Sequence, residues 1–136
     1  PIAADESIRR ARDPYRVVEA DAADIGVVKQ APLGGVRNTL RLGRELGLDL
    51  TVASALDTAV GINAGLVTAK LAGSRAAGLA TQRLFVADVA EERELVRGCY
   101  STAPLRPDPA RLEDLAAPAA RRDWWFARVR ECLAAL

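Results

Sequence analysis

Three short apolar runs, each followed by a polar residue, stand out in the first half of this 136-residue chain. The runs are residues 2–4, 25–28 and 48–53. They hold few polar positions, which predicts strands buried on both faces, as in a parallel sheet. Asp5, Lys29 and Ser54 come directly after the three runs, at almost equal spacing. The spacing predicts one strand in each of three repeating units.

The segments between the runs carry helix signals. Helices are predicted for residues 14–20, 36–46 and 59–71. Asp13 precedes a proline, a combination typical of a helix start, and we expect its side chain to cap the first helix. Gly47 marks the end of the second helix. Asp57 or Thr58 is expected to cap the third.

Strands that alternate with helices indicate parallel βαβ units, and therefore an α/β fold. Nearly apolar strands leave two architectures open, a barrel and a doubly wound sheet. In a (β/α) barrel, the residues that end the strands meet on the rim, where such barrels place their chemistry. A strand must in any case end in a polar residue, so spacing alone leaves both a functional and a structural role open for these positions.

The second half of the chain has a different character. Glycines after residue 72 predict a loop, residues 84–86 form a brief apolar run, and three prolines between 104 and 109 predict an extended linker. One helical stripe then follows at Trp125, Val129, Cys132 and Leu136. The stripe predicts a terminal helix that packs on the rest of the protein. We assign residues 1–84 to the βα units and residues 85–136 to a C-terminal tail.

Composition narrows the possible functions. The chain has 19 basic and 18 acidic residues, and its charges are mixed along the sequence, which argues against a nucleic-acid binder. Cys99 and Cys132 form no CxxC pair and the chain has no histidine, so neither a zinc site nor a disulfide scaffold is expected. No signal peptide and no apolar run of ~20 residues is visible. These features predict a cytoplasmic protein with free thiols and no membrane partner.

Three sequence motifs resemble the enolase superfamily, and in particular its o-succinylbenzoate synthase branch. Residues 1–8, PIAADESI, resemble the sixth-strand element P-I-A-x-D-E-S. Residues 23–36, ADIGVVKQAPLGGV, resemble the seventh-strand element A-D-x-x-V-x-K-x-A-P-L-G-G. Residues 54–61, SALDTAVG, resemble the eighth-strand element S-A-L-D-T/S-x-x-G. Residues 108–112 and the Trp124-Trp125 pair look like the tail of its actinobacterial members.

The resemblance implies the C-terminal part of a (β/α)7β barrel, with a tail that returns to an α+β capping domain. The family reaction is a magnesium-assisted syn-dehydration of 2-succinyl-6-hydroxy-2,4-cyclohexadiene-1-carboxylate to o-succinylbenzoate, a menaquinone precursor. The resemblance thus implies a carbon–oxygen lyase with a small carboxylate as substrate. Mg²⁺, or Mn²⁺ in its place, holds the substrate carboxylate and stabilises the enediolate that forms when the weakly acidic α-proton leaves.

The resemblance also implies roles for individual residues. Asp5 matches the third carboxylate ligand of the metal, although a helix cap is its structural alternative. Lys29 matches a catalytic lysine, although a surface lysine that extends past an apolar strand is possible. Gly35, Ser54 and Gly78 match positions that contact substrate carboxylates, often through the backbone.

The match to the family pattern is incomplete. Gln30 replaces a small or β-branched residue, Ala53 replaces a serine, and residues 78–82, GLATQ, lack two glycines of the usual G-L-G-T-G. The paired K-x-K lysines and the first two metal ligands have no counterpart in the chain. We therefore expect a fragment whose partner is the N-terminal remainder of the same enzyme.

Two other functions stay open at this point. An N-succinylamino acid racemase, or another proton-abstracting member of the superfamily, would use the same lysines and metal on a different substrate. A barrel fragment without catalytic activity would instead serve as a structural or interaction module. The K-x-K motif and two further carboxylates in the upstream sequence would distinguish an enzyme from such a fragment.

Overall fold

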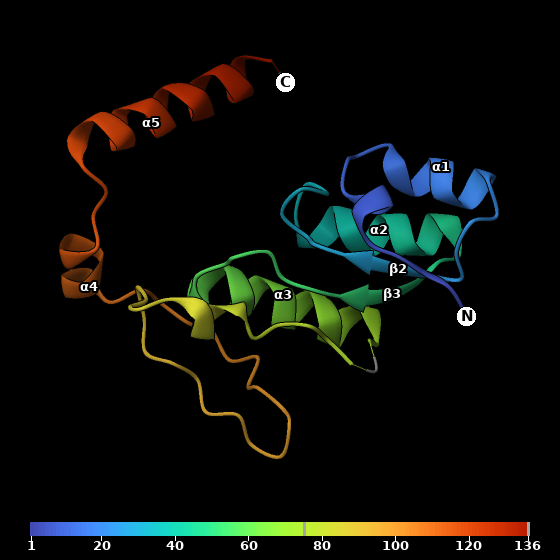
Figure 1. Cartoon of the computed structure of the whole chain (residues 1–136), viewed down its shortest axis with the longest axis horizontal. Helices are drawn as coiled ribbons and strands as arrows, with labels where there is room; N and C mark the ends of the chain where they lie inside the picture. The colour runs from blue at the N-terminus through green and yellow to red at the C-terminus, as the bar shows by residue number, and fades with distance from the viewer. Residues whose placement is uncertain (75, 136) are drawn as a thin grey trace.

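The computed structural model describes residues 1–74 and 76–135 (Figure 1). The first part of the chain forms three strands with helices between them, and the second part is an extended tail. The elements, with η for a 3-10 helix, are β1 (Ala3–Ala4), η1 (Glu6–Ile8), α1 (Asp13–Glu19), β2 (Ile25–Val28), α2 (Val36–Leu46), β3 (Asp49–Val52), α3 (Ala59–Ala72), η2 (Thr81–Leu84), α4 (Pro109–Asp114) and α5 (Ala119–Ala134).

The strands form one parallel sheet in the order β1-β2-β3. Ala3 lies opposite Ile25, and Ile25 lies opposite Asp49. One further parallel bridge joins Ala53 to Gly78, so the segment after α3 returns to the sheet beside β3. The three predicted strands, their parallel direction and the α/β class are therefore confirmed.

The core lies between the sheet and its helices. α1 contacts α2 and α2 contacts α3, so the three helices form one layer along the sheet (Figure 1). Val28 and Val52 point into this layer and are 2% and 0% exposed. The other buried members of the core are Leu33, Leu42, Ile62, Leu66, Ala69 and Leu79. Each such side chain stabilises the fold by about 1.5–3 kcal/mol, which fixes the strands against the helix layer.

The opposite face of the sheet is only half-buried. Ile25, Val27 and Lys29 on this face alternate with Gly26 and Val28, which are buried. Successive side chains of a strand point to opposite faces, so Lys29 points away from the helix layer. In a (β/α) barrel the face without helices is the interior, whose carboxyl end forms the rim.

α2 has the predicted start and end and lies very close to β3. A Cβ atom on Gly43 would lie 2.7 Å from Leu50 Cδ1, so any larger residue where the helix meets the strand would have to displace the Leu50 side chain. Gly47 ends the helix with φ of 60°, a left-handed conformation that glycine adopts at the lowest cost.

The expected cap of α1 is wrong. Asp13 is the first residue of the helix rather than its cap, and its Oδ2 accepts the N–H of Arg10 at 2.7 Å. The carboxylate therefore closes the turn before the helix. The negative charge of Asp13 still lies in the first turn of α1, where it interacts favourably with the positive end of the helix dipole.

The tail is attached to α3 at its first turn. Thr58 is the N-terminal cap residue, as predicted, but its side chain makes no capping hydrogen bond. Asp88 from the tail accepts the N–H of Ala59 through Oδ2 at 2.8 Å. Asp57, the other predicted cap, instead accepts the N–H of Ala55 at 3.1 Å. The capping carboxylate thus comes from a distant part of the chain.

A second attachment lies one turn further along α3. Arg93 donates through Nη2 to Asn63 Oδ1 on α3 at 2.7 Å and to the Ala103 carbonyl at 2.5 Å. Its Nη1 donates to the Ser101 carbonyl at 2.9 Å. One guanidinium therefore joins the helix to two points of the tail.

α5 projects away from the sheet and its helices (Figure 1). Every described residue from Asp108 onward is exposed, including Trp124 and Trp125, which contact each other edge to face at 4.7 Å between ring centroids. Packing of the terminal stripe on the barrel units is not seen within the described residues. Packing on a capping domain stays a prediction, and Leu136, the last residue of the stripe, lies outside the described residues.

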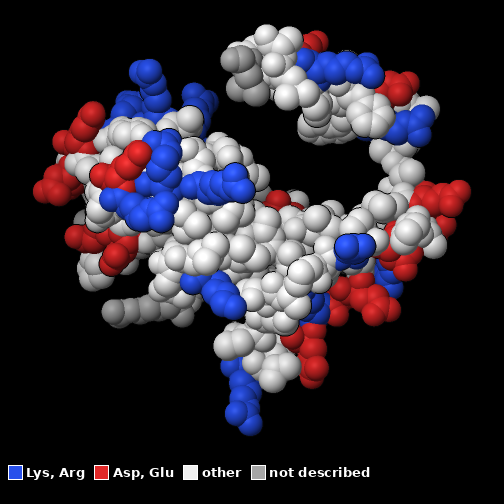
Figure 2. Space-filling model, turned by 180° about the vertical axis from the view of Figure 1, so that it is seen from behind, with Lys and Arg blue, Asp and Glu red and all other residues white. Residues whose placement is uncertain are grey.

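Charges of both signs are spread over the surface. Figure 2 shows Lys and Arg intermixed with Asp and Glu on the face that it presents. Among residues 1–74 and 76–135, no helix is both long enough and apolar enough to span a membrane.

Candidate active site

Asp5 and Lys29 meet at the carboxyl end of the parallel sheet. Asp5 follows β1 and Lys29 follows β2, and these two strands are hydrogen-bonded neighbours. Lys29 Nζ donates to Asp5 Oδ1 at 2.5 Å. The lysine side chain is 12% exposed and the aspartate side chain is 36% exposed. The structure therefore brings together the two residues that the resemblance placed at the centre of the site.

Neither structural alternative describes these two residues well. Asp5 is the N-terminal cap residue of η1, yet its side chain makes no capping hydrogen bond. Lys29 is largely buried and paired, unlike a lysine that extends its charge into water. Taking the Lys29 ammonium out of water is costly, and its pairing with Asp5 offsets part of that cost.

Ser54 and Gly78 lie at the next strand position along the rim. The Ser54 N–H donates to the Gly78 carbonyl and the Gly78 N–H donates to the Val52 carbonyl, both at 2.9 Å. These two backbone N–H groups are thus already used by the sheet. If Ser54 binds a ligand, it must do so through its side chain.

Gly35 precedes α2 on the same edge of the sheet. Its φ of 96° is accessible mainly to glycine, and a Cβ atom there would meet nothing within 4 Å. Its N–H donates to the Gln30 carbonyl at 2.7 Å, and its own carbonyl accepts from Thr39. The Gly35 N–H is also engaged, so the glycine shapes the loop that follows Lys29. Substrate contact at Gly35 stays a prediction.

Gln30, which departs from the family pattern, points to the helix side of the sheet. It is 5% exposed, and its Nε2 donates to the Gly61 carbonyl in α3 at 3.4 Å. A polar residue in this position ties the end of β2 to α3. It does so directly behind Lys29, on the opposite face of the strand.

Sequence reasoning missed one polar residue of the rim, Thr81. Its hydroxyl lies 2.8 Å from Ser54 Oγ and donates to the Ala55 carbonyl at 2.5 Å. Thr81 falls within the GLATQ segment. The threonine of the family's G-L-G-T-G pattern is present there, although two of its glycines are missing.

A metal ion would find one suitable ligand here. Asp5 offers a hard carboxylate oxygen at a strand end, which suits Mg²⁺ or Mn²⁺. Among the described residues, no group of three His, Cys, Asp or Glu side chains is close enough to hold an ion. The donor chemistry of Asp5 fits such a metal, but further ligands are needed to complete a site.

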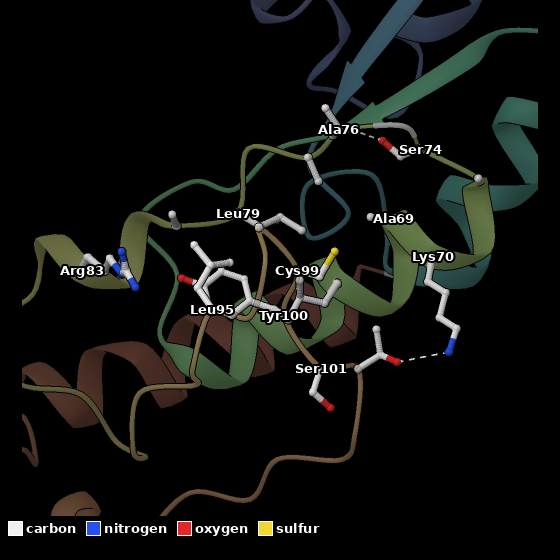
Figure 3. Close-up of a pocket in the computed structure, with 16 residues that line it drawn as sticks. Ala69, Lys70, Ser74, Ala76, Leu79, Arg83, Leu95, Cys99, Tyr100 and Ser101 are labelled. Atoms are coloured by element: carbon white, nitrogen blue, oxygen red, sulfur yellow. Dashed lines mark hydrogen bonds between the residues drawn. The ribbon is translucent and has the colours of Figure 1, made fainter.

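A pocket lies elsewhere, between α3 and the tail (Figure 3). It has a volume of about 850 Å³, and Lys70, Arg83 and Tyr100 contribute its polar lining. A hydrogen bond with Glu92 raises the pKa of Arg83 above its usual value, so the guanidinium stays charged. Asp5, Lys29, Gly35, Ser54 and Gly78 do not line this pocket. The pocket is therefore separate from the rim.

Comparison with curated proteins gives close relatives over the whole chain. The chain is 54% identical over 134 residues to the o-succinylbenzoate synthase of Mycolicibacterium smegmatis, a match that covers 97% of this chain and 42% of the relative. It is 51% identical over 138 residues to the o-succinylbenzoate synthase of Mycobacterium leprae, with 100% and 41% covered. The chain thus spans about two-fifths of the length of these relatives. No family model matches the chain.

Solved structures agree on the fold. Muconate lactonizing enzyme from Pseudomonas putida is similar with a TM-score of 0.66 and 26% identity, over 86% of this chain and 36% of that one. N-succinyl Arg/Lys racemase from Bacillus cereus is similar with a TM-score of 0.68 and 20% identity, over 85% and 33%. Fold and relatives together show that the chain belongs to the enolase superfamily. Within it, the chain belongs to the o-succinylbenzoate synthase family and corresponds to a portion of those proteins.

Proposed function

We propose that this chain is part of an o-succinylbenzoate synthase, a lyase that acts in menaquinone biosynthesis. Its reaction is the metal-assisted syn-dehydration of 2-succinyl-6-hydroxy-2,4-cyclohexadiene-1-carboxylate to o-succinylbenzoate. The observation that carries the proposal is the Lys29–Asp5 pair at the sheet rim, in a chain 51–54% identical to proteins of that name. The remainder of the same enzyme is the proposed partner of the chain.

Lys29 supplies a fixed positive charge in this proposal. Its Nζ lies on the face of the sheet opposite the helices, where the substrate of a barrel enzyme binds. Loss of the α-proton adds negative charge to the substrate, and a preorganised ammonium stabilises that charge. A charge over the substrate ring also gains cation–π attraction of about 2 kcal/mol or more when desolvated. By resemblance, a lysine outside this chain removes the proton.

Asp5 is the proposed metal ligand of this chain. Bound Mg²⁺ or Mn²⁺ would supply concentrated positive charge to the substrate carboxylate. Asp5 Oδ2 forms no hydrogen bond with the described residues, so one oxygen is open to a ligand. Ser54, Gly35 and Gly78 are the proposed substrate-facing positions, and Ser54 is the one of the three with a polar side chain.

An assay of the full-length protein separates the candidate functions. We expect turnover of the cyclohexadiene substrate and little racemisation of N-succinyl amino acids. Efficient racemisation with no dehydration would assign the same site to the racemase alternative. Absence of both activities, with Mg²⁺ or Mn²⁺ present and a cooperative thermal transition retained, would favour a structural module and contradict the proposal.

A further inference from the structure

Three short oxygen–oxygen contacts surround Ser54 and Thr81 at the rim. Thr81 Oγ1 lies 2.5 Å from the Ala55 carbonyl and 2.8 Å from Ser54 Oγ. Ser54 Oγ lies 3.0 Å from the Gly78 carbonyl. Both hydroxyl residues are half-buried, and the contact between their two hydroxyls is partly buried.

Two hydroxyl protons must serve these three contacts. A carbonyl oxygen only accepts, so the shortest contact requires the Thr81 proton to point at the Ala55 carbonyl. Thr81 then has no proton left for Ser54, and the 2.8 Å contact requires the Ser54 proton to point at Thr81. The contact left without a proton is the longest one, to the Gly78 carbonyl, which already accepts the Ser54 N–H. Any other arrangement places two lone pairs face to face across a shorter distance.

We infer that Thr81 is a positioning residue that fixes the direction of the Ser54 hydroxyl. Thr81 takes the Ser54 proton, and Ser54 Oγ therefore presents only lone pairs to the site. Ser54 then acts as a hydrogen-bond acceptor and recognises the ring hydroxyl of the substrate, not a bare carboxylate oxygen. The inference rests on the proposed function, because it assigns a role within the same site.

The position of Thr81 suits this role. It begins η2, directly after the segment that bridges β3 through Gly78. Its hydroxyl thus joins the loop after β3 to the segment that follows α3, and both carry residues of the rim. Loss of the hydroxyl would leave the Ala55 carbonyl without this donor and would let the Ser54 hydroxyl rotate.

Variants of the full-length enzyme test the inference. For Thr81→Val we expect a 3- to 10-fold rise in KM with kcat within about threefold, the scale of one neutral hydrogen bond. Ser54→Ala should raise KM by a similar factor. The double variant should be no worse than either single variant, because both remove one shared unit. Thr81→Ser keeps the hydroxyl and should restore wild-type KM.

The controls separate positioning from general stability. Thr102→Val makes the same chemical change on the tail and should leave KM unchanged. Thermal melts accompany each variant, and Thr81→Ala replaces Thr81→Val if the latter does not fold. If KM is unchanged in the Thr81 variant, or if the Ser54 and Thr81 effects add, the inference is overturned. A decrease in KM would show that Ser54 donates to the substrate, and would also overturn it.

A binding measurement keeps this test distinct from that of the proposed function. Calorimetry gives the Kd of o-succinylbenzoate without turnover; this product has lost the ring hydroxyl of the substrate and has no hydrogen-bond donor at neutral pH, so Thr81→Val should leave its Kd within about twofold while it raises KM of the substrate. A wild-type protein that binds this ligand without dehydrating the substrate overturns the proposed function alone. A 3- to 10-fold weakening of o-succinylbenzoate binding in Thr81→Val, equal to the rise in KM, would show that Ser54 does not recognise a donor of the substrate, and overturns the inference alone. No binding by the wild type overturns both.

Discussion

The βα units and the tail are held by different interactions. In residues 1–84, apolar side chains from strands and helices form a continuous core. In the described residues after 84, the only buried hydrophobic residue is Ala90, and Tyr100 packs partly buried against the core. Asp88 and Arg93 hold the tail to α3 by hydrogen bonds. The first region can therefore hold charged groups in fixed positions. The tail has few apolar contacts, and polar contacts contribute much of its attachment.

The two lysines of the chain give the sharpest test of this difference, with the largest expected effect. Lys29 lies in the sheet region and Lys70 lies at the tail pocket, 3.3 Å from Thr102 Oγ1. We expect Lys29→Met to lower kcat of the full-length enzyme by at least ~10²-fold while the fold survives, because preorganised charge at a developing oxyanion contributes that much. Lys29→Arg should not rescue it fully, since a planar guanidinium cannot occupy the same point.

Lys70→Met is the matched control for Lys29. Its steady-state kinetics should match wild type, because Lys70 does not lie at the rim. Thermal melts of both variants complete the measurement. A folded Lys29→Met enzyme with kcat within a few-fold of wild type would show that Lys29 has no catalytic role.

Asp5 gives the next largest effect. Asp5→Asn keeps the size of the side chain but removes one anionic ligand, so Mg²⁺ affinity and activity should both fall, by about tenfold or more. Titration calorimetry with Mg²⁺ measures the affinity directly. Glu6→Gln is the control, since Glu6 is exposed and pairs only with Arg9 among the described residues. If Asp5→Asn binds Mg²⁺ as tightly as the wild type, Asp5 is not a metal ligand and serves only as the ion-pair partner of Lys29.

Asp88 tests the attachment of the tail. Asp88→Ala removes the carboxylate that caps α3 and should lower the free energy of unfolding by about 0.5–2 kcal/mol, the usual cost of losing an N-terminal cap. Denaturant melts measure the change, with Asp114→Ala on exposed α4 as the control. An effect no larger than that of the control would mean that the tail does not depend on this contact.

Trp125→Ala has the smallest expected effect on the free energy of unfolding. It tests whether α5, unlike the sheet region, lacks a hydrophobic packing partner. The Trp125 side chain is 53% exposed, so Trp125→Ala should change the free energy of unfolding by less than about 0.5 kcal/mol if α5 has no partner. A loss of about 3–5 kcal/mol in the full-length enzyme would show instead that the ring is buried there. The tail helix would then be part of a core that the described residues do not contain.

The sequence predicted the sheet region well because burial there is periodic. The strand ending at Val28 and the helix ending before Gly47 followed directly from apolar spacing and a glycine stop. The proximity of Asp5 and Lys29 followed from parallel topology, which brings successive strand ends to one edge. Their roles came only from the resemblance.

The polar contacts between distant segments were not predictable in the same way. Nothing in the local sequence indicates that Asp88 caps a helix that begins at Ala59, because the two become neighbours only after the tail folds back. Thr81 was missed for the same reason. Its partners, Ser54 and Ala55, lie more than 25 positions earlier in the chain.

Arg93 has a consequence for how the molecule opens. One guanidinium joins Asn63 to the carbonyls of Ser101 and Ala103, and its Nε is buried without a hydrogen-bond partner among the described residues. Loss of the Arg93 contacts would release residues 94–103 from α3 in one step, while the core beneath α3 remains folded. In amide hydrogen exchange, the hydrogen-bonded amides of Val96, Cys99 and Ala103 should therefore lose protection together and at a lower free energy than α3, as one cooperative unit of local unfolding.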